Sequence, residues 1–176
     1  MRRPWIAIAH VLFVLGSTLA TAQTAPNGPA IPNARAALPG VWSGGQPSEA
    51  QIAEAASAGF KTVINLRAPT EPGHDWEQAA VERSGMLYVH IPVDGAAGLT
   101  HENVDRLDAA LRVASARGPV LLHCASGNRI GAMLALREAW LRGTAPAQAL
   151  DVGRAAGLTR LEPAVKELLG LPADTP

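Results

Sequence analysis

The sequence is poor in the residues that would indicate a disulfide scaffold or a nucleic-acid-binding surface. One of its 176 residues is a cysteine, Cys124, and a single cysteine cannot form a disulfide within its own chain. The fifteen basic residues balance the fifteen acidic ones, and lysine occurs only at Lys61 and Lys166. This balance, with no basic run, predicts no nucleic-acid binding. Cys124 is therefore either a buried, inert residue or one kept for its reactivity.

The N-terminus has the pattern of a signal peptide. Arg2 and Arg3 precede an apolar run that ends at Leu19, and the small-x-small triplet Ala20-Thr21-Ala22 follows. The expected product is exported in a bacterium, to the periplasm or the medium, with no membrane span left after cleavage. The expected segments are a signal peptide at residues 1–22, a flexible leader rich in Pro, Asn and Ala at residues 23–36, and one domain at residues 37–171.

Helical and strand patterns alternate along the rest of the chain. The expected strands are short β-branched or apolar runs, and most of the expected helices end at or near a glycine. This alternation is typical of an α/β domain with a central, mostly parallel sheet flanked by helices. Capping boxes at Ser48-x-x-Gln51 and Thr159-x-x-Glu162 would open the first and the last helix. The expected strands span residues 62–66, 87–91 and 120–123, and the expected helices span residues 48–58, 75–83, 100–116, 130–141, 146–156 and 159–169.

Cys124 stands where an apolar strand gives way to a short loop and a helix, in the run Val120-Leu-Leu-His-Cys-Ala-Ser-Gly-Asn-Arg-Ile-Gly131. Ligands of open α/β sheets bind beyond the carboxyl ends of the strands. Consecutive amides that lead into a helix N-terminus form a cradle for an anion, and the same field stabilises a thiolate. Gly127 gives the backbone freedom, and Arg129 offers a planar fork to two anion oxygens. The sequence therefore predicts Cys124 as a nucleophile in an anion-binding loop made of Ala125, Ser126, Gly127, Asn128 and Arg129.

This loop resembles the active-site loop of the cysteine-dependent phosphatases. Together with Trp42-Ser-Gly-Gly-Gln-Pro-Ser48 and Ala58-Gly-Phe-Lys-Thr-Val-Ile-Asn-Leu-Arg67, it resembles the phosphatase-like domain of the beta-lactamase-hydrolase-like family, over about residues 38–142. The resemblance implies a dual-specificity-phosphatase-like fold in which Cys124 is the nucleophile and Arg129 binds the anion. It also implies that Asp94, on the loop after the preceding strand, is the general acid that protonates the leaving oxygen. No cofactor and no metal are expected, because the histidines and acids show no ligand spacing.

Two departures from the phosphatase pattern leave the reaction open. Phosphatases of this superfamily usually have five residues between the cysteine and the arginine and a Ser or Thr after the arginine, whereas this chain has four, Ala125 to Asn128, and then Ile130. The short spacing and the Gly-Asn-Arg ending resemble rhodanese-type sulfurtransferases, in which Cys124 would carry a persulfide. A third alternative is a non-catalytic anion-binding or redox-sensing module. Of the three, we expect a phosphatase-type hydrolase, whose substrate is a phosphorylated small molecule or protein. Under the second alternative, the substrate is a small molecule or protein that carries sulfane sulfur.

Other polar residues near the loop have structural as well as functional interpretations. Ser126 and Asn128 are expected to shape the loop through hydrogen bonds to its backbone. His123 either tunes the thiolate or packs behind the loop. Arg67 and Glu71 follow another strand and could line the pocket, but an ordinary surface ion pair is the simpler interpretation.

Overall fold

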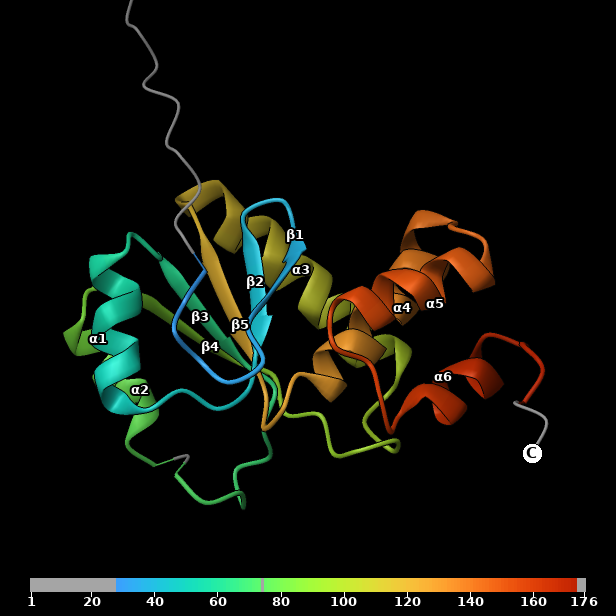
Figure 1. The fold of residues 1–176 in the computed structure, drawn as a ribbon, viewed down its shortest axis with the longest axis horizontal. Helices are drawn as coiled ribbons and strands as arrows, with labels where there is room; N and C mark the ends of the chain where they lie inside the picture. Colours follow the sequence, from blue (N-terminus) through green and yellow to red (C-terminus); the bar gives the residue numbers. More distant parts are fainter. Residues whose placement is uncertain (1–27, 74, 174–176) are drawn as a thin grey trace, which may run out of the picture.

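A five-stranded sheet forms the centre of the protein. The computed structural model describes residues 28–73 and 75–173, so the expected signal peptide and residues 23–27 lie outside the described residues. Helices α1 and α2 cover one face of the sheet, α3 and α4 cover the other, and α5 and α6 pack beside α4 (Figure 1). The strands are β1 (Arg35–Leu38), β2 (Val41–Gly44), β3 (Thr62–Asn65), β4 (Leu87–His90) and β5 (Val120–His123). The helices are α1 (Glu49–Ser57), α2 (Glu77–Arg83), α3 (His101–Arg117), α4 (Asn128–Arg142), α5 (Pro146–Ala155) and α6 (Glu162–Leu168).

The strand order β1-β2-β5-β3-β4 confirms the expected mostly parallel sheet. Only β1 and β2 pair antiparallel, and every other neighbouring pair is parallel. Strand β5 lies in the middle, so the chain that follows it emerges between the loops that follow β2 and β3. The loops after β3, β4 and β5 gather at the lower edge of the sheet in Figure 1. This edge is where an α/β sheet is expected to bind its ligand.

Alternate residues of the central strands pack on opposite faces of the sheet. Val63 and Leu121 join the apolar cluster under α1 and α2, whereas Ile64 and Leu122 join the larger cluster under α3 and α4. None of the four is exposed to solvent. Burial of one such side chain stabilises a fold by about 1.5–3 kcal/mol. The two clusters therefore hold β3 and β5 firmly between two helical layers.

The described part of the expected leader is packed, which differs from the sequence prediction. Ile31 is buried, and β1 begins at Arg35. Strand β1 pairs antiparallel with β2, which the sequence does not predict as a strand either, since it is only four residues long and ends in Gly44. Backbone pairing at the sheet edge, rather than an apolar run, holds this segment. Composition alone therefore gives no signal for it.

Three helix starts also differ from the sequence prediction, and the first is that of α2, which begins at Glu77 and not at residue 75. Helix α4 begins at Asn128 and not at Ile130, so Asn128 and Arg129 form its first turn. Helix α6 has Leu161 as its N-cap residue, with no side-chain hydrogen bond, so the predicted Thr159 capping box is wrong. The Thr159 hydroxyl donates instead to Oδ1 of Asn128, at 3.1 Å. The other predicted capping box, from Ser48 to Gln51, is complete at the start of α1.

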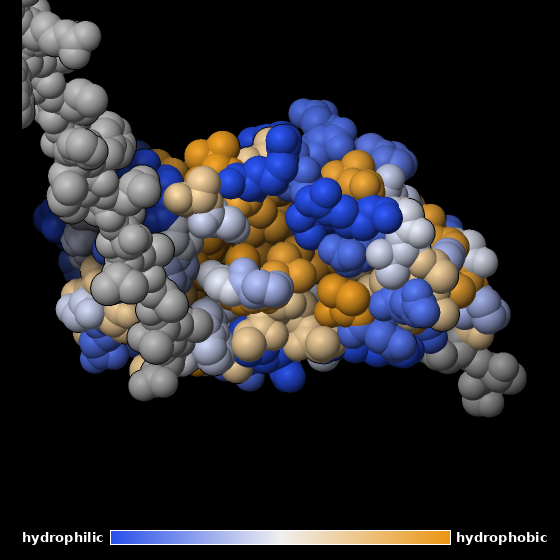
Figure 2. Space-filling view, turned by 90° about the horizontal axis from the view of Figure 1, so that it is seen from above, coloured by the Kyte–Doolittle hydropathy of each residue, from blue (hydrophilic) through white to orange (hydrophobic). Residues whose placement is uncertain are grey.

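The end of the sheet opposite the loops after β3, β4 and β5 has an apolar centre (Figure 2). Figure 2 views the molecule of Figure 1 from above and shows hydrophobic residues gathered in the middle of this face, with hydrophilic residues around them.

Within residues 28–73 and 75–173, no helix combines the length and the apolar character that crossing a bilayer requires.

Candidate active site

A cavity of about 410 Å³ opens at the carboxyl ends of the parallel strands. Its walls come from the loops after β3, β4 and β5 and from the connection between α5 and α6. It therefore contains the loop that the sequence singled out and three segments that are distant from that loop in the chain. The lining residues are Ala68, Thr70, Glu71, Asp94, Gly95, Ala125, Ser126, Asn128, Arg129, Arg160 and Leu161.

Cys124 lies at the base of the loop beside this cavity. The residue is 1% exposed, and its Sγ accepts a hydrogen bond from the backbone N–H of Gly127 at 3.1 Å. Gly127 has a φ of +94°, a left-handed conformation that glycine adopts without strain. This conformation turns the chain directly into α4, whose N-terminus therefore faces the sulfur. A backbone N–H donor and the positive end of a helix dipole both favour a thiolate over a thiol.

The backbone after β2 supports the loop. The N–H of Cys124 donates to the carbonyl of Gly44 at 3.3 Å, and the N–H of Gln46 donates to the carbonyl of Ala125 at 3.4 Å. Between these two contacts, Gly45 and Ser126 form an isolated antiparallel bridge. A Cβ at position 45 would lie 3.0 Å from the Ala125 carbonyl oxygen, a tight approach that a side chain could make only if the neighbouring backbone shifted slightly. The Gly-Gly-Gln segment is thus a support for the loop that carries Cys124.

Arg129 is held by an acidic residue from another loop. Its Nη1 lies 2.5 Å from Oε1 of Glu71 and its Nη2 lies 2.8 Å from Oε2, while Nη1 also donates to the carbonyl of Val93 at 3.1 Å. The hydrogen bonds from Arg129 lower the pKa of Glu71 to about 2, against partial burial, which raises it, and with help from the N–H of Ala68. The pKa of Arg129 is raised, first by its hydrogen bonds to Glu71, against partial burial, which lowers it, and further by the neighbouring Cys124. Glu71 and Arg129 are therefore both charged, and Arg129 lies close to the sulfur.

Arg67 is not part of an ordinary surface ion pair, so that interpretation of the sequence is wrong. The residue is 5% exposed, and its guanidinium donates to Oε2 of Glu71 at 3.3 Å and to the carbonyl of Pro72 at 2.6 Å. It also donates to the side chain of Gln46. The interpretation failed because Glu71 turns toward the cavity, where it joins Arg67 to Arg129. Arg67 does not line the cavity, but it holds the residue that orients Arg129.

Asp94, which the family resemblance implies as the general acid, and Ser126 of the loop both lie on the cavity wall. Asp94 is exposed on the loop after β4, and the carbonyl of that loop's Val93 is an acceptor for Arg129. Ser126 is partly buried, and its carbonyl accepts from the side-chain amide of Asn33 at 3.2 Å. The contact with Asn33 places the loop against the segment that precedes β1.

Asn128 binds a neighbouring segment rather than the backbone of its own loop, which corrects the prediction for this residue. Its Oδ1 accepts from the N–H of Thr159 at 2.8 Å, from the Thr159 hydroxyl at 3.1 Å and from the N–H of Leu161 at 3.2 Å. Asn128 thus fastens the connection between α5 and α6, residues 156–161, to the start of α4. A short polar side chain in a helix's first turn is well suited to such a bond, but the sequence does not reveal the partner.

His123 points away from Cys124, toward the opposite face of the sheet. The ring is fully buried, and its Nε2 lies 2.5 Å from Oε1 of Glu77, which is also fully buried. The contact has the distance of an ion pair but not the alignment of a hydrogen bond, and neither atom completes a hydrogen bond among the described residues. Oε2 of Glu77 accepts from Asn65 at 2.9 Å, and Asn65 also contacts the hydroxyl of Tyr88 at 3.0 Å. His123 therefore belongs to a buried polar network beneath the loop.

The sequence did not identify Glu77 or Asn65 as members of this network. One signal was available, since Glu77 begins a helix whose next inward-facing residues, Ala80 and Val81, are apolar. An acid on the buried stripe of a helix needs a partner, because burial of an unpaired charge is costly.

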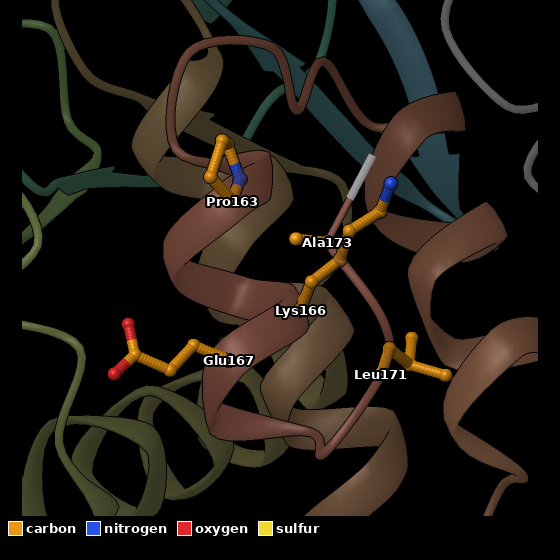
Figure 3. A pocket seen from close by; sticks show the side chains of 5 residues that line it. All are labelled: Pro163, Lys166, Glu167, Leu171 and Ala173. Atoms are coloured by element: carbon orange, nitrogen blue, oxygen red, sulfur yellow. The ribbon is translucent and has the colours of Figure 1, made fainter. Parts of the chain in front are cut away.

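A second cavity lies away from Cys124, at the C-terminal end of the described chain. Pro163, Lys166, Glu167, Leu171 and Ala173 line it (Figure 3). Figure 3 shows the Glu167 carboxylate directed away from the Lys166 ammonium. None of these five residues is a cysteine, serine or histidine, so the cavity beside Cys124 is the better candidate for chemistry. The described residues contain no cluster of three or more His, Cys, Asp or Glu that could hold a metal ion.

Comparisons with known proteins agree with this geometry. Residues 34–141 match the family described as the phosphatase-like domain of beta-lactamase hydrolase-like protein. A beta-lactamase hydrolase-like protein of Xylella fastidiosa is 38% identical over 98 residues, which are 53% of this chain and 22% of that protein. The matched part therefore spans about a fifth of the length of this curated relative.

Two crystal structures of candidate phosphatases share the fold. The one from Shewanella putrefaciens CN-32 is 28% identical, with a TM-score of 0.62, and the alignment covers 79% of this chain and 87% of that one. The one from Neisseria meningitidis is 25% identical, with a TM-score of 0.61, and the alignment covers 73% of this chain and 90% of that one. The α/β architecture expected from the sequence is thus the architecture of these proteins.

Proposed function

The chain belongs to the family of phosphatase-like domains of beta-lactamase hydrolase-like proteins, and on that premise we propose that it is a cysteine-dependent phosphatase of phosphate monoesters. One observation carries the proposal. Cys124 accepts the N–H of Gly127 at the start of α4, beside the cavity that Arg129 lines. A nucleophile, amide donors and a cation thus converge where a phosphoryl group would bind.

In the first step, the Cys124 thiolate attacks phosphorus in line with the leaving oxygen. The sulfur–phosphorus bond forms as the phosphorus–oxygen bond breaks, and Asp94 gives its proton to the leaving oxygen. In the second step, water attacks phosphorus and gives a proton to the Asp94 carboxylate. The sulfur–phosphorus bond then breaks, inorganic phosphate leaves, and the thiolate is restored.

Arg129 would bind the equatorial oxygens of the phosphoryl group while it stays paired with Glu71. A guanidinium has five N–H donors. Glu71 and the carbonyl of Val93 engage both hydrogens of Nη1 and one hydrogen of Nη2. The Nε hydrogen and the second Nη2 hydrogen remain for an anion. In this proposal Glu71 orients the arginine and does not block it, and such preorganised donors supply much of the stabilisation of a transition state.

The experiment measures hydrolysis of para-nitrophenyl phosphate by the purified protein. Cys124→Ser is expected to abolish turnover. Asp94→Asn is expected to lower kcat by about 10²-fold or more, because it removes the general acid. Asp105→Asn, an exposed aspartate on α3, is the matched control and should stay within about twofold of wild type. Turnover that persists in Cys124→Ser would refute the proposal, and binding of phosphate without turnover would favour the non-catalytic module.

A second candidate, a sulfurtransferase, is favoured by the length of the loop. Only Ala125, Ser126 and Gly127 separate Cys124 from α4, and Ile130 is fully buried, so no hydroxyl follows Arg129 to assist release from a phosphocysteine. In this reaction, the thiolate attacks the sulfane sulfur of thiosulfate and sulfite leaves. Cyanide then takes the sulfur from the Cys124 persulfide as thiocyanate, which restores the thiolate. Thiocyanate formation that depends on Cys124, with a mass gain of about 32 Da and no phosphate release, would replace the phosphatase proposal by this one.

We propose further that the protein is exported. The support is the charged, apolar and small-residue pattern that ends at Ala22. N-terminal sequencing of the protein from cell fractions should find Gln23 as the first residue, outside the cytoplasm. A cytoplasmic protein that retains Met1 or Arg2 would contradict this proposal.

A further inference from the structure

Two arginines line the cavity beside Cys124, and their surroundings differ. Arg129 is paired with Glu71. Arg160 is exposed, and among residues 28–73 and 75–173 it has no ion pair and no side-chain hydrogen bond. By contrast Arg154, an exposed arginine nearby in the sequence, binds Asp151 and Glu162. Arg160 is therefore a cation at the cavity wall that remains available to a ligand.

The backbone on both sides of Arg160 is fixed to the loop that carries Cys124. Oδ1 of Asn128 accepts from the N–H groups of Thr159 and Leu161, the two neighbours of Arg160. Asn128 in turn precedes Arg129 in the first turn of α4. One side chain thus sets the position of the Arg160 backbone relative to Arg129.

Close packing behind this segment reinforces the attachment. A Cβ added at Gly131 would lie 2.1 Å from the backbone nitrogen of Leu158 and 2.5 Å from the carbonyl oxygen of Gly153. A Cβ added at Gly157 would lie 3.3 Å from the carbonyl oxygen of Gly127. The backbone at the start of α4 is therefore in close contact with the backbone of the end of α5 and of the α5–α6 connection. The segment that carries Arg160 is a fixed wall of the cavity.

The charge balance of the cavity leaves Arg160 able to bind a second anion. Glu71 and Asp94 supply two acids to the lining, and Arg129 and Arg160 supply two cations. Arg67 behind the wall also donates to Glu71, so the Glu71 charge is shared between two arginines. A general-acid aspartate is protonated when the substrate binds and adds no negative charge. A phosphoryl group on Arg129 and the loop amides would then leave Arg160 without a counter-charge.

We propose that Arg160 binds a second anionic group of the substrate, so that the site selects phosphate monoesters that also carry a phosphate or a carboxylate. This inference rests on the proposed phosphatase function and names its substrate class. A planar guanidinium binds either group in the same two-point manner. The phosphoryl group that reacts stays at Cys124, and Arg160 determines specificity without taking part in the bond changes.

The first test is a binding measurement that needs no turnover. Isothermal titration calorimetry compares benzylphosphonate, 4-carboxybenzylphosphonate and 1,4-xylylenebisphosphonate on the Cys124→Ser protein. The second anion is expected to tighten binding by about five- to tenfold, the range for a charged hydrogen bond at an exposed site. Adding Arg160→Gln should remove this preference, and adding Arg154→Gln should keep it. The carboxylate and bisphosphonate arms show which second group the site favours. Equal affinities for all three ligands, or a preference that survives Arg160→Gln, would overturn the inference.

The second test measures kcat/KM for phenyl phosphate and 4-carboxyphenyl phosphate. The ratio of the two values, carboxylate over phenyl, should fall by about fivefold in Arg160→Gln and stay within about twofold in Arg154→Gln. An unchanged ratio with intact turnover would refute the role of Arg160 and leave the phosphatase proposal standing. Absence of turnover in the wild type would refute the phosphatase proposal. The calorimetric binding preference would then be the test of whether Arg160 binds a second anion.

Discussion

Glu71 holds Arg129 with both carboxylate oxygens, at 2.5 Å and 2.8 Å, although 58 positions separate the two residues in the chain. The contact joins the loop after β3 to the first turn of α4. It fixes the plane of the guanidinium before any anion arrives. A site whose donors are already oriented does not have to reorganise when charge develops on the substrate.

Arg129→Ala should raise the pKa of Glu71 from about 2 toward its ordinary value of 4.5, because Arg129 is the main cause of the lowering. A carbon-13 NMR titration of the side-chain carboxyls measures this directly. Arg154→Ala is the matched control, since Arg154 lowers the pKa of Glu162 to about 2 but is remote from Glu71. Arg154→Ala should raise the pKa of Glu162 alone. A Glu71 that titrates near 4.5 in the wild type would contradict the pairing.

The same pair predicts how stability changes with pH. The pKa of Glu71 is lower in the folded protein than in the unfolded chain, so the pair stabilises the fold fully above about pH 4.5 and loses this effect as the pH falls toward 2. Arg129→Ala should therefore lower the free energy of unfolding by about 1 kcal/mol near neutral pH, a value reduced by partial solvent screening. Urea denaturation at pH 7 and pH 3 measures the difference, which should shrink at the lower pH. A difference that grows on acidification would rule out this account.

Gly127→Ala should slow the reaction of Cys124 with iodoacetamide. The φ of +94° costs a residue with a Cβ about 1–2 kcal/mol, and the loop that relaxes this strain moves the N–H donor away from the sulfur. We expect alkylation at pH 7 to slow by about tenfold. Gly143→Ala is the matched control, because Gly143 ends the same helix with a φ of +69° and open space around it. Both variants should lose similar stability, and equal alkylation rates in both would contradict the role of the Gly127 amide.

Gly131→Ala should destabilise the protein, although the same change in an exposed helix stabilises by about 1 kcal/mol. The added methyl would lie 2.1 Å from the Leu158 nitrogen, and backbone on both sides leaves no room for it. We expect a loss of about 2–4 kcal/mol in urea denaturation. Gly153→Ala perturbs the same contact, so the double variant should lose less than the sum of the single losses. Additive losses would show that the two glycines do not share one interface.

Glu77→Ala should cost about 3–5 kcal/mol of stability. The substitution removes one acceptor of the buried Asn65 amide and the ion-pair partner of the buried His123 ring. Glu82→Ala, on the exposed side of the same helix, should change stability by less than about 0.5 kcal/mol. Chemical denaturation of both variants checks the difference. Similar losses in the two would mean that helix propensity, and not the buried network, sets the effect.

Local signals in the sequence predicted the elements that local forces determine. The Ser48 capping box, the strand Val120–His123 and the turn at Gly127 each depend on residues that are neighbours in the chain. The Thr159 capping box failed because Asn128 binds both the N–H and the hydroxyl of Thr159, and helix α6 begins only at Glu162. No pattern within residues 159–162 contains that information.

The contacts that complete the candidate site join residues that are distant in the chain. For each contact, the sequence predicted one of the two residues but not its partner. Cys124, Arg129 and Asp94 were predicted from the loop and the resemblance, and all three lie at the carboxyl edge of the sheet. Glu71 was recognised as a neighbour of the site but assigned to the surface, because its orientation depends on Arg67 and Arg129 together. Arg160 was not recognised at all. Its place follows from a bond made by Asn128, whose sequence context suggested only a loop.

The bridge between Gly45 and Ser126 has a consequence for how this loop can change in evolution. Ser126 is held by the segment after β2, and Asn128, two residues later, is held by the segment before α6. An insertion between Cys124 and Arg129 would break one of these attachments. The spacing between Cys124 and Arg129 is therefore constrained by three segments together: the loop itself, the segment after β2 and the segment before α6. Descendants with a longer loop are expected to carry coordinated replacements in all three, rather than a single inserted residue.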